Sequence, residues 1–447
     1  MPRAARPEAW RRLNPSPVPT SSEGVLAGGQ TDSGWRGQVA TFAVLGGTTF
    51  NLFLCFVQTR IMGVSDAHVM LAELILIASA FLAALSRRVD MYLLSALFIS
   101  YMILLFALRG AIDLKALRDI LIPIAFYFLG SAVQNARLAD RLVTITILIA
   151  LVVGLFEYLF LETYLDYFNV LGYFISRGTV TLEESFGATR GLFISGLRPE
   201  PRTLLPFLGQ HRVSGVFLEP VSAGNFGAII YAWALFRPAM RLRYLVIAAA
   251  LTTIVLADAR FGFFTCILVT LMLPFYRLVP RLVWAIMPFL MLTSVAVYGL
   301  ATGADGGAND IAGRFSVTAT LLTKLDFAVI IGAQTTDQFT ADSGLAYTLT
   351  KFGIVGFVFL WAAFAYAPIK DRRAWTFHSM VMIYLLLLML ISNSFFSIKT
   401  AALVWFLVGT AGAVDWSGLS GAQTRPKPSN SLSVPRRGRS QQLRKNP

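Results

Sequence analysis

Hydrophobic residues occur along this chain in long runs, and short polar links separate one run from the next. A helix of roughly 20 mostly apolar residues is long enough to cross a bilayer. The pattern therefore predicts an all-α, polytopic integral membrane protein with about 12 transmembrane helices in a membrane domain over residues 38–413. The predicted helices lie near residues 38–59, 67–86, 90–108, 118–135, 142–161, 213–236, 243–258, 261–279, 282–300, 343–367, 377–393 and 395–413.

Two longer links, at about residues 162–212 and 301–342, interrupt the series of short ones. Links of this length in a compact protein usually have a function. Within the first, residues 191–210 mix apolar residues with prolines, which predicts a short helix or re-entrant piece on the bilayer surface. Within the second, residues 311–325 show a helical pattern.

The two ends of the chain are polar. Residues 1–37 are rich in Pro, Gly and Ser and contain no short apolar core with a cleavage site, so they do not resemble a signal peptide. Residues 414–447 form a basic stretch with Ser, Pro and Gln. Both stretches are predicted to be disordered tails.

Composition narrows the class of protein further. Of 447 residues, 56% are hydrophobic and 14% are charged, with a mean hydropathy of +0.65. A soluble domain carries roughly 25% charged residues. This excess of apolar residues excludes a soluble enzyme, a disulfide-rich secreted module and a disordered regulator. Cys55 and Cys266 both lie in apolar runs and are interpreted as small core residues.

The net charge of +14 indicates orientation in a membrane and not binding to nucleic acid, because the basic residues lie in the tails and the short links. If both termini are cytoplasmic, the inner links carry most of these residues, and the two long links become outer, periplasmic loops. Arg109, Lys115 and Arg118 are the main basic residues in an outer link. The basic residues of the inner links are Arg87, Arg88, Arg137, Arg141, Arg237, Arg241, Arg243, Arg277, Arg281, Lys370, Arg372 and Arg373.

Several catalytic signatures are absent from the sequence. There is no Gly-Lys pair of a phosphate-binding loop and no Asp-x-Asp pair of a simple nucleotide-sugar metal site. His68, His211 and His378 are far apart along the chain, which argues against a zinc site. We therefore expect no metal and no cofactor.

What remains is a set of ionisable groups near the outer membrane boundary. An ionisable residue within a membrane segment is a functional hypothesis by default. Arginine binds phosphate oxygens in pairs, and a nearby carboxylate can accept a proton from a hydroxyl. The set predicts recognition of a lipid diphosphate by arginines, with Glu219 and Asp342 as candidate bases and His211 as a third. Its members are Glu73, Glu157, His211, Arg212, Glu219, Asp258, Arg260, Arg314 and Asp342.

Structural explanations for these residues stay open at this point. Arg212 is also typical of an interfacial anchor whose charged head reaches the headgroups. Arg260 is also placed to pair with Asp258. Glu219-Pro220 is typical of a helix start, and Asp342-Ser343 of a helix cap. For Glu73 and Glu157, pairing with a neighbouring helix is favoured over chemistry.

Taken in order, the motifs resemble the O-antigen polymerase and O-antigen ligase superfamily over about residues 205–360. Arg212-x-x-Gly215-x-Phe217-x-x-Pro220 follows a long outer loop and opens a helix. Arg260 stands where the family often has Ser-Arg, and Arg314 precedes a helical stretch that ends in Ile330-Ile331-Gly332. Asp342 then leads through Tyr347 into Lys351-Phe-Gly353-Ile-Val-Gly356, similar to the family's polar-Tyr-Gly-Gly segment.

The resemblance implies a metal-independent glycosyltransferase of the bacterial inner membrane that uses an undecaprenyl-diphosphate-linked glycan as donor. It implies that Arg212, Arg260 and Arg314 bind the donor diphosphate, with Tyr347 as a secondary candidate beside His211. It also implies a lipid-linked glycan acceptor and, as partners, a chain-length regulator and a flippase.

Within that superfamily, the sequence favours a polymerase of exopolysaccharide, capsule or O-antigen repeat units. Ligases usually carry His-Asn where this chain has Ala341-Asp342. A ligase that transfers the glycan to another acceptor is the first alternative. A polysaccharide transporter or lipid-glycan flippase is the second, although its polar residues would be expected through the whole depth of the membrane.

Overall fold

A computed structural model gives the fold. It describes residues 29–85, 89–181, 191–197, 202–276, 278–303, 311–336, 340 and 342–416. The described part of the chain is all-helical, with one isolated antiparallel bridge between Leu197 and His211. Most of the two predicted tails lies outside the described residues, and the first helix already includes residues 29–37.

Seven described helices are long and apolar enough to cross a membrane. They are α1 (Gly29–Arg60), α2 (Asp66–Ala84), α3 (Val89–Arg109), α4 (Leu114–Val133), α5 (Ala136–Leu159), α11 (Arg281–Thr302) and α14 (Gly344–Ala365). Five further helices are apolar but shorter: α8 (Pro220–Phe236), α9 (Arg243–Leu256), α10 (Arg260–Leu271), α15 (Ala374–Met389) and α16 (Ile398–Ala413). The chain is thus a helical membrane protein by length and composition of its helices.

Each predicted apolar run contains one of these helices, but the shorter helices fill only part of their runs. Residues 213–219 form a turn of 3-10 helix, η4 (Gly215–Phe217), and not the first part of a membrane helix. In the described parts of residues 191–210, which are residues 191–197 and 202–210, the only helical pieces are short 3-10 turns at Ile194–Gly196 and Pro206–Leu208. The predicted helix over residues 311–325 is confirmed as α12 (Ile311–Thr323).

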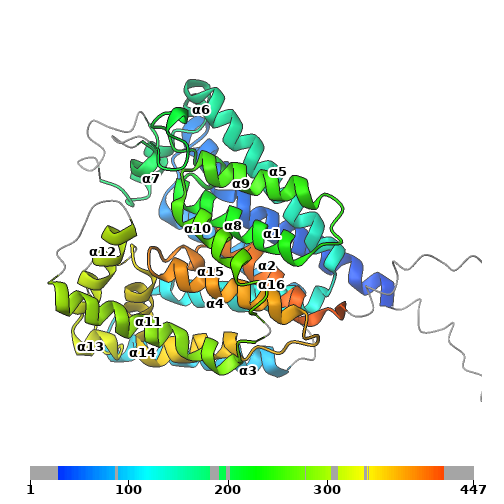
Figure 1. Ribbon diagram of the computed structural model, residues 1–447. Coiled ribbons are helices and arrows are strands. Elements are labelled where there is room, and N and C mark those ends of the chain that lie inside the picture. The colour runs from blue at the N-terminus through cyan, green and yellow to red at the C-terminus, as the bar shows by residue number, and fades with distance from the viewer. Residues whose placement is uncertain are drawn as a thin grey trace, which may run out of the picture.

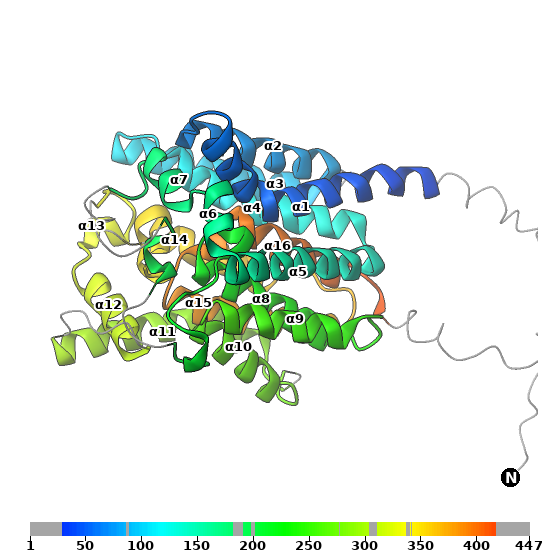
Figure 2. The same cartoon turned by 90° about the horizontal axis from the view of Figure 1, so that it is seen from above.

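Four helices outside the twelve apolar ones gather at one end of the bundle, which we call the loop end (Figure 1). They are α6 (Leu161–Tyr167), α7 (Val170–Ser176), α12 and α13 (Phe327–Ile330). Figure 2 shows the same grouping from above, with α1 beginning at the opposite, terminal end. Hydrogen bonds tie the loop end together: the Asn169 amide before α7 donates to Thr59 of α1, and Arg177 after α7 pairs with Asp66 of α2.

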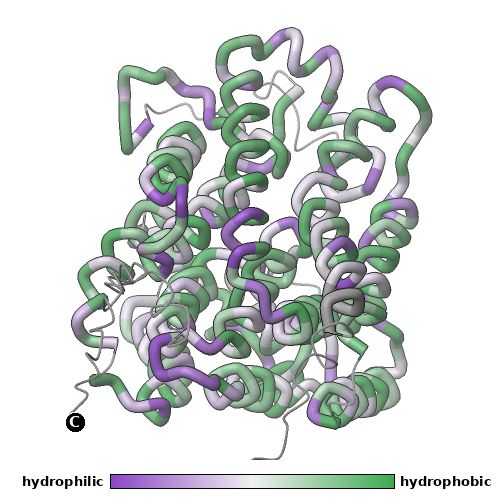
Figure 3. The backbone as a smooth tube through the Cα atoms, turned by 90° about the vertical axis from the view of Figure 1, so that its right-hand side faces the viewer, coloured by the Kyte–Doolittle hydropathy of each residue, from purple (hydrophilic) through white to green (hydrophobic). Residues whose placement is uncertain are grey.

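Apolar side chains face outward along much of the bundle, as expected for helices in contact with lipid. On α3 alone, Leu93, Ile103 and Leu108 are at least 60% exposed. Hydrophobic residues make up most of the helices, and the strongly hydrophilic stretches lie mainly in turns and links (Figure 3). A soluble protein of this size would not leave so many large aliphatic side chains in water.

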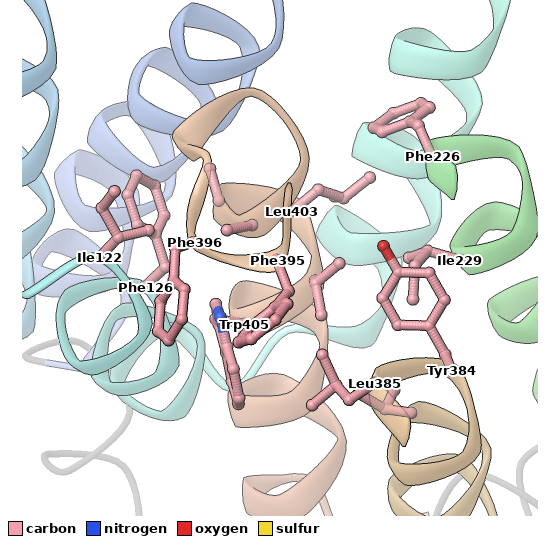
Figure 4. Packing of buried hydrophobic residues seen from close by; sticks show 14 of the residues in the cluster. Ile122, Phe126, Phe226, Ile229, Tyr384, Leu385, Phe395, Phe396, Leu403 and Trp405 are labelled. Atoms are coloured by element: carbon pink, nitrogen blue, oxygen red, sulfur yellow. The ribbon is translucent and has the colours of Figure 1, made fainter. Parts of the chain in front are cut away.

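The centre of the bundle is formed around α16, all of whose residues are buried. Figure 4 shows side chains from α4, α8, α15 and α16 converging there, with Phe395 and Phe396 of η5 (Ser394–Phe396) between α4 and α16. The backbones of α4 and α16 are in direct contact at two glycines. A Cβ on Gly130 would lie 2.0 Å from the Phe406 carbonyl oxygen, and a Cβ on Gly409 would lie 1.9 Å from the Tyr127 carbonyl oxygen.

Helix α14 is interrupted at Gly353, whose φ of 65° and ψ of 172° are not helical. The interruption leaves carbonyl groups without their hydrogen bonds within the helix, and side chains of α3 donate hydrogen bonds to them instead. Arg109 donates to the carbonyl oxygens of Thr350 and Lys351, and the Tyr101 hydroxyl donates to that of Phe352. An irregular backbone at membrane depth is tolerated only where such groups find partners.

Candidate functional site

The segment from His211 to Pro220 lies at the loop end and leads into α8. Glu157 of α5, which is fully buried, holds this segment in place. Its carboxylate accepts hydrogen bonds from the backbone amides of Ser214 and Gly215 and lies 2.9 Å from His211 Nε2. Glu157 therefore has a structural role, but its partners lie in the segment before α8, whereas the sequence favoured a partner in a neighbouring helix.

Arg212 is 3% exposed and serves the packing of the loop. Its Nε donates to the Ala257 carbonyl oxygen at 3.1 Å, and its Nη1 donates to that of Ser195, also at 3.1 Å. Its backbone amide donates to the Gly196 carbonyl oxygen at 2.8 Å. Arg212 thus connects residues 191–197 to the turn between α9 and α10. An interfacial anchor would keep its charged head in water, which this side chain does not.

Glu219 pairs with Lys399, a residue of α16 that the sequence analysis missed. Lys399 Nζ lies 2.5 Å from Glu219 Oε2, and the Ser222 hydroxyl donates to the same oxygen at 2.9 Å. The lysine is buried, whereas the glutamate side chain is 28% exposed. Pro220 begins α8, so the Glu219-Pro220 pair does mark a helix start. One feature of the sequence could have drawn attention to Lys399: it is a lone ionisable residue within the apolar run 395–413.

Arg260 begins α10, and this helix start packs against α8. Gly224 of α8 allows the close approach, since a Cβ there would lie 1.9 Å from the Ala259 side chain. Asp258, two residues before Arg260, accepts hydrogen bonds at 3.0 Å from the backbone amides of Thr203 and Leu204. The fold therefore brings the first turn of α10 to the first turns of α8, where Glu219 lies.

Two residues with strained backbone stand beside these candidates. Leu218 has a φ of 60° and directly precedes Glu219, and Asp258 has a φ of 46° and lies two residues before Arg260. Positive φ values are uncommon for residues other than glycine, and such strain concentrates at functional sites. In this chain the strain turns the backbone sharply before α8 and before α10.

Asp342 lies at the start of α14, also at the loop end. The cap of α14 is Ser343, whose hydroxyl accepts a hydrogen bond from the Ala346 amide at 3.2 Å. The Asp342-Ser343 pair therefore does mark a helix cap, and the side chain that forms it is Ser343 and not Asp342. Gly344 then packs directly against the end of α15, at Met389 and Ser392.

Arg314 lies in α12, and its side chain is outside the described residues. The helix that carries it is joined to the end of α15, because the Thr318 hydroxyl donates to the Leu390 carbonyl oxygen at 2.6 Å. The backbone at Arg314 is thus at the loop end, on the same side of the bundle as Asp342.

Tyr347 is buried and belongs to a separate group of charges between α2, α4 and α14. Its hydroxyl donates to Asp119 Oδ2 at 2.5 Å. Arg118 binds the other oxygen of Asp119 at 2.6 Å and Glu73 at 2.6 Å. Glu73 is therefore paired with a neighbouring helix, as expected. This group ties three helices together near the loop end, and it uses the one proton that the Tyr347 hydroxyl can donate.

Further contacts join the starts of the helices at the loop end. Asn225 of α8 donates to the Ser394 hydroxyl at 3.2 Å, and the Thr400 hydroxyl of α16 donates to the Ser394 carbonyl oxygen at 2.8 Å. The starts of α8, α10, α14 and α16 therefore meet there. Helix N-termini carry a partial positive charge, which favours bound anions.

Over the described ranges, no group of three or more His, Cys, Asp or Glu side chains is placed to hold a metal ion. Cys55 and Cys266 are both buried thiols. Two cavities among the described helices are lined mainly by apolar residues, such as Leu151 and Val213 in one and Phe357 and Trp361 in the other.

No protein-family model, curated protein or solved structure matches this chain.

Proposed function

We propose that this protein polymerises undecaprenyl-diphosphate-linked oligosaccharide repeat units at the outer face of the bacterial inner membrane. The seven long and five shorter apolar helices would form twelve spans, with the loop end outside and both termini in the cytoplasm. The product would be an exopolysaccharide, capsule or O-antigen chain. The enzyme would be a glycosyltransferase that needs no metal ion.

The observation that carries the proposal is the meeting of charged candidates at one end of the bundle. Glu219 with its partner Lys399, Arg260 at the start of α10 and Asp342 at the start of α14 all lie at the loop end. They come from elements far apart in the sequence. A transport path would instead be expected to place ionisable groups through the depth of the membrane.

The distribution of charge supports the proposed orientation. Basic residues in short links mark the cytoplasmic side of a membrane protein. At the terminal end the described basic side chains outnumber the acidic ones, whereas the loop end carries both signs. The described acidic residues of the terminal end are Asp90, Asp140, Asp371 and Asp415. The described basic residues of the terminal end are Arg36, Arg137, Arg141, Arg237, Arg241, Arg243, Arg281, Lys370, Arg372 and Arg373.

The proposed reaction transfers a glycan between two lipid-linked substrates. A hydroxyl of the acceptor sugar attacks the anomeric carbon of the donor and forms the new C–O bond. The bond between that carbon and the diphosphate oxygen breaks, and undecaprenyl diphosphate leaves with the electron pair. Glu219 or Asp342 accepts the hydroxyl proton. Arg212, Arg260 and Arg314 stabilise the charge that develops on the diphosphate.

Chain lengthening in proteoliposomes tests this proposal. The protein would be reconstituted with undecaprenyl-diphosphate-linked repeat units, and product length would be measured on gels. We expect Arg260→Gln, Arg314→Ala and Glu219→Gln each to lower lengthening by about 100-fold, the usual effect of removing one group that stabilises a transition state. Single repeat units would then remain on the lipid.

Arg60→Gln is the matched control, because Arg60 is an exposed arginine at the loop end of α1 that lies over the Tyr167 ring and has no role in the proposed site. Arg212→Ala belongs in the set as well, with a measurement of folding, because Arg212 also packs the loop. Long polymer at the normal rate from both Arg260→Gln and Arg314→Ala would contradict the site. Glycan transfer to lipid A core instead of to a repeat unit would identify a ligase, and transbilayer movement without lengthening would identify a flippase.

A further inference from the structure

Arg202, which the sequence analysis did not single out, lies at the loop end with a guanidinium that is only partly used. The side chain is 2% exposed. Its Nη1 donates to the Val255 carbonyl oxygen at 3.3 Å, near the end of α9. Its guanidinium carbon lies 5.7 Å from the centre of the Tyr158 ring, within the range of a cation–π contact.

The other two nitrogens of this guanidinium, Nε and Nη2, are buried and have no hydrogen-bond partner within the described part of the chain. Leaving a charged donor buried without a partner is costly, more so than for a neutral group. Burial also lowers the pKa of Arg202, and the nearby Tyr158, Asp258 and Glu157 only partly oppose this. The side chain therefore lacks the anion that its position requires.

Nε and Nη2 form one edge of the guanidinium, which is the edge that other arginines of this chain use for anions. In Arg237, these two nitrogens donate to the two carboxylate oxygens of Asp140 at 3.1 and 2.8 Å. In Arg118, both donate to Asp119. The same edge of a guanidinium binds two oxygens of a phosphate group equally well.

The carboxylates nearest to Arg202 are already used by the backbone. Asp258 accepts hydrogen bonds from the amides of Thr203 and Leu204, the two residues that follow Arg202. Glu157 accepts the amides of Ser214 and Gly215. Among the described carboxylates, these two are thus engaged by the backbone and do not bind the Nε–Nη2 edge. An anion from outside the chain would satisfy this edge without breaking these bonds.

We propose that Arg202 is a phosphate-binding residue of the loop end, which takes two oxygens of one phosphate group on Nε and Nη2. The inference deepens the proposed function and rests on it for the identity of the ligand, the diphosphate of the lipid-linked donor. Arg202 then joins Arg212, since both side chains donate to carbonyl groups at the end of α9. Tyr158 beside Arg202 is itself partly exposed, so the guanidinium lies one side chain from solvent.

Binding of inorganic pyrophosphate to the purified full-length protein in detergent tests this inference. Breaking charge-assisted hydrogen bonds weakens binding by about tenfold or more. We expect Arg202→Gln to show this loss. Arg202→Lys is expected to lose nearly as much, because an ammonium lacks the paired edge. Arg177→Gln, which removes the same charge at the same end of the bundle, is expected to bind pyrophosphate as the wild type does.

Two competition experiments distinguish a polyprenyl diphosphate from a phospholipid headgroup as the source of the phosphate group. Polyprenyl diphosphate in nanodiscs is expected to compete with pyrophosphate, whereas phosphatidylglycerol nanodiscs are not. Equal competition by both would assign the residue to lipid headgroups and overturn the donor as its ligand. Equal pyrophosphate affinity in the wild type and Arg202→Lys, or no binding by the wild type, would overturn the inference.

Thermal stabilisation by pyrophosphate provides a second measurement if Arg202→Gln folds poorly, because Arg202→Lys keeps the charge. The stabilisation is expected in the wild type and absent in Arg202→Lys, and equal stabilisation in both would contradict the inference. The proposed function can fail separately: a protein that binds pyrophosphate through Arg202 but lengthens no glycan would leave this site in place and remove the polymerase.

Discussion

Replacing Lys399 by Met while Glu219 is retained should lower the free energy of unfolding by about 3 kcal/mol. The lysine is buried and lies 2.5 Å from the glutamate, so its loss leaves a carboxylate without its counter-charge among helices α8 and α16. The Ser222 hydroxyl alone would then remain on that oxygen. Denaturation of the purified protein in detergent, followed by the loss of helical signal, measures the change.

The double variant Glu219→Leu with Lys399→Met is the control for this prediction. Replacing both members of a buried ion pair by apolar residues is often neutral or stabilising, because neither charge is left alone. We expect the double variant to unfold close to the wild type, although it loses chain lengthening with Glu219. A Lys399→Met variant as stable as the wild type would show that the pair does not exist as described.

Substitution of Gly409 by Ala is the second large effect that we expect, because it separates α4 from α16. The added Cβ would lie 1.9 Å from the Tyr127 carbonyl oxygen, and backbone cannot yield as the end of a side chain can. The two helices would have to move apart at the centre of the bundle. We expect a loss of about 3 kcal/mol or more of stability, at the upper end of the effects of overpacking.

Gly37→Ala is the matched control, since it places a methyl group on another helix at an ordinary contact distance of 3.6 Å from Leu138. Alanine favours a helix over glycine by up to about 1 kcal/mol, so this variant should be unchanged or slightly more stable. Gly130→Ala should resemble Gly409→Ala, because its Cβ would meet the Phe406 carbonyl oxygen at 2.0 Å. Equal midpoints for Gly409→Ala and Gly37→Ala would contradict the close packing of α4 and α16.

The hydrophobic pattern predicts where helices occur in this chain better than where they begin. Every predicted apolar run contains a helix, because the length of a run follows from its residues alone. The start of α8 was placed too early, at residue 213. Val216 and Phe217 are apolar, but they are buried in a 3-10 turn before Pro220 opens the helix. Hydropathy does not distinguish burial in protein from exposure to lipid.

The helices α6 and α7 also escaped prediction. Each has seven residues and lies in a stretch of mixed polarity. Short helices have little intrinsic stability and form because tertiary contacts hold them. Here such contacts include the Tyr164 hydroxyl, which donates to the Gly215 carbonyl oxygen at 3.0 Å, and the Asn169 amide, which donates to Thr59. These partners are far away in the sequence.

Prediction of the candidate site was limited by the same lack of long-range information. The sequence places Glu219 and Arg260 near one boundary through the alternation of helices. It does not reveal that Lys399 lies against Glu219, because that pairing depends on how α16 packs beside α8. Nor does it separate Arg212, whose guanidinium donates to three carbonyl groups, from Arg202, which has two nitrogens without a partner among the described residues.

The side of the membrane on which the loop end lies is tested most directly by labelling of introduced cysteines in intact cells. The native Cys55 and Cys266 are buried and give little background. Glu162→Cys and Lys324→Cys place exposed thiols in the two loops that are proposed to lie outside, and Arg372→Cys places one at the terminal end. We predict that a membrane-impermeant thiol reagent labels the first two in intact cells and labels the third only after lysis. Labelling of Arg372→Cys alone in intact cells would place the charged loop end in the cytoplasm and would contradict the account.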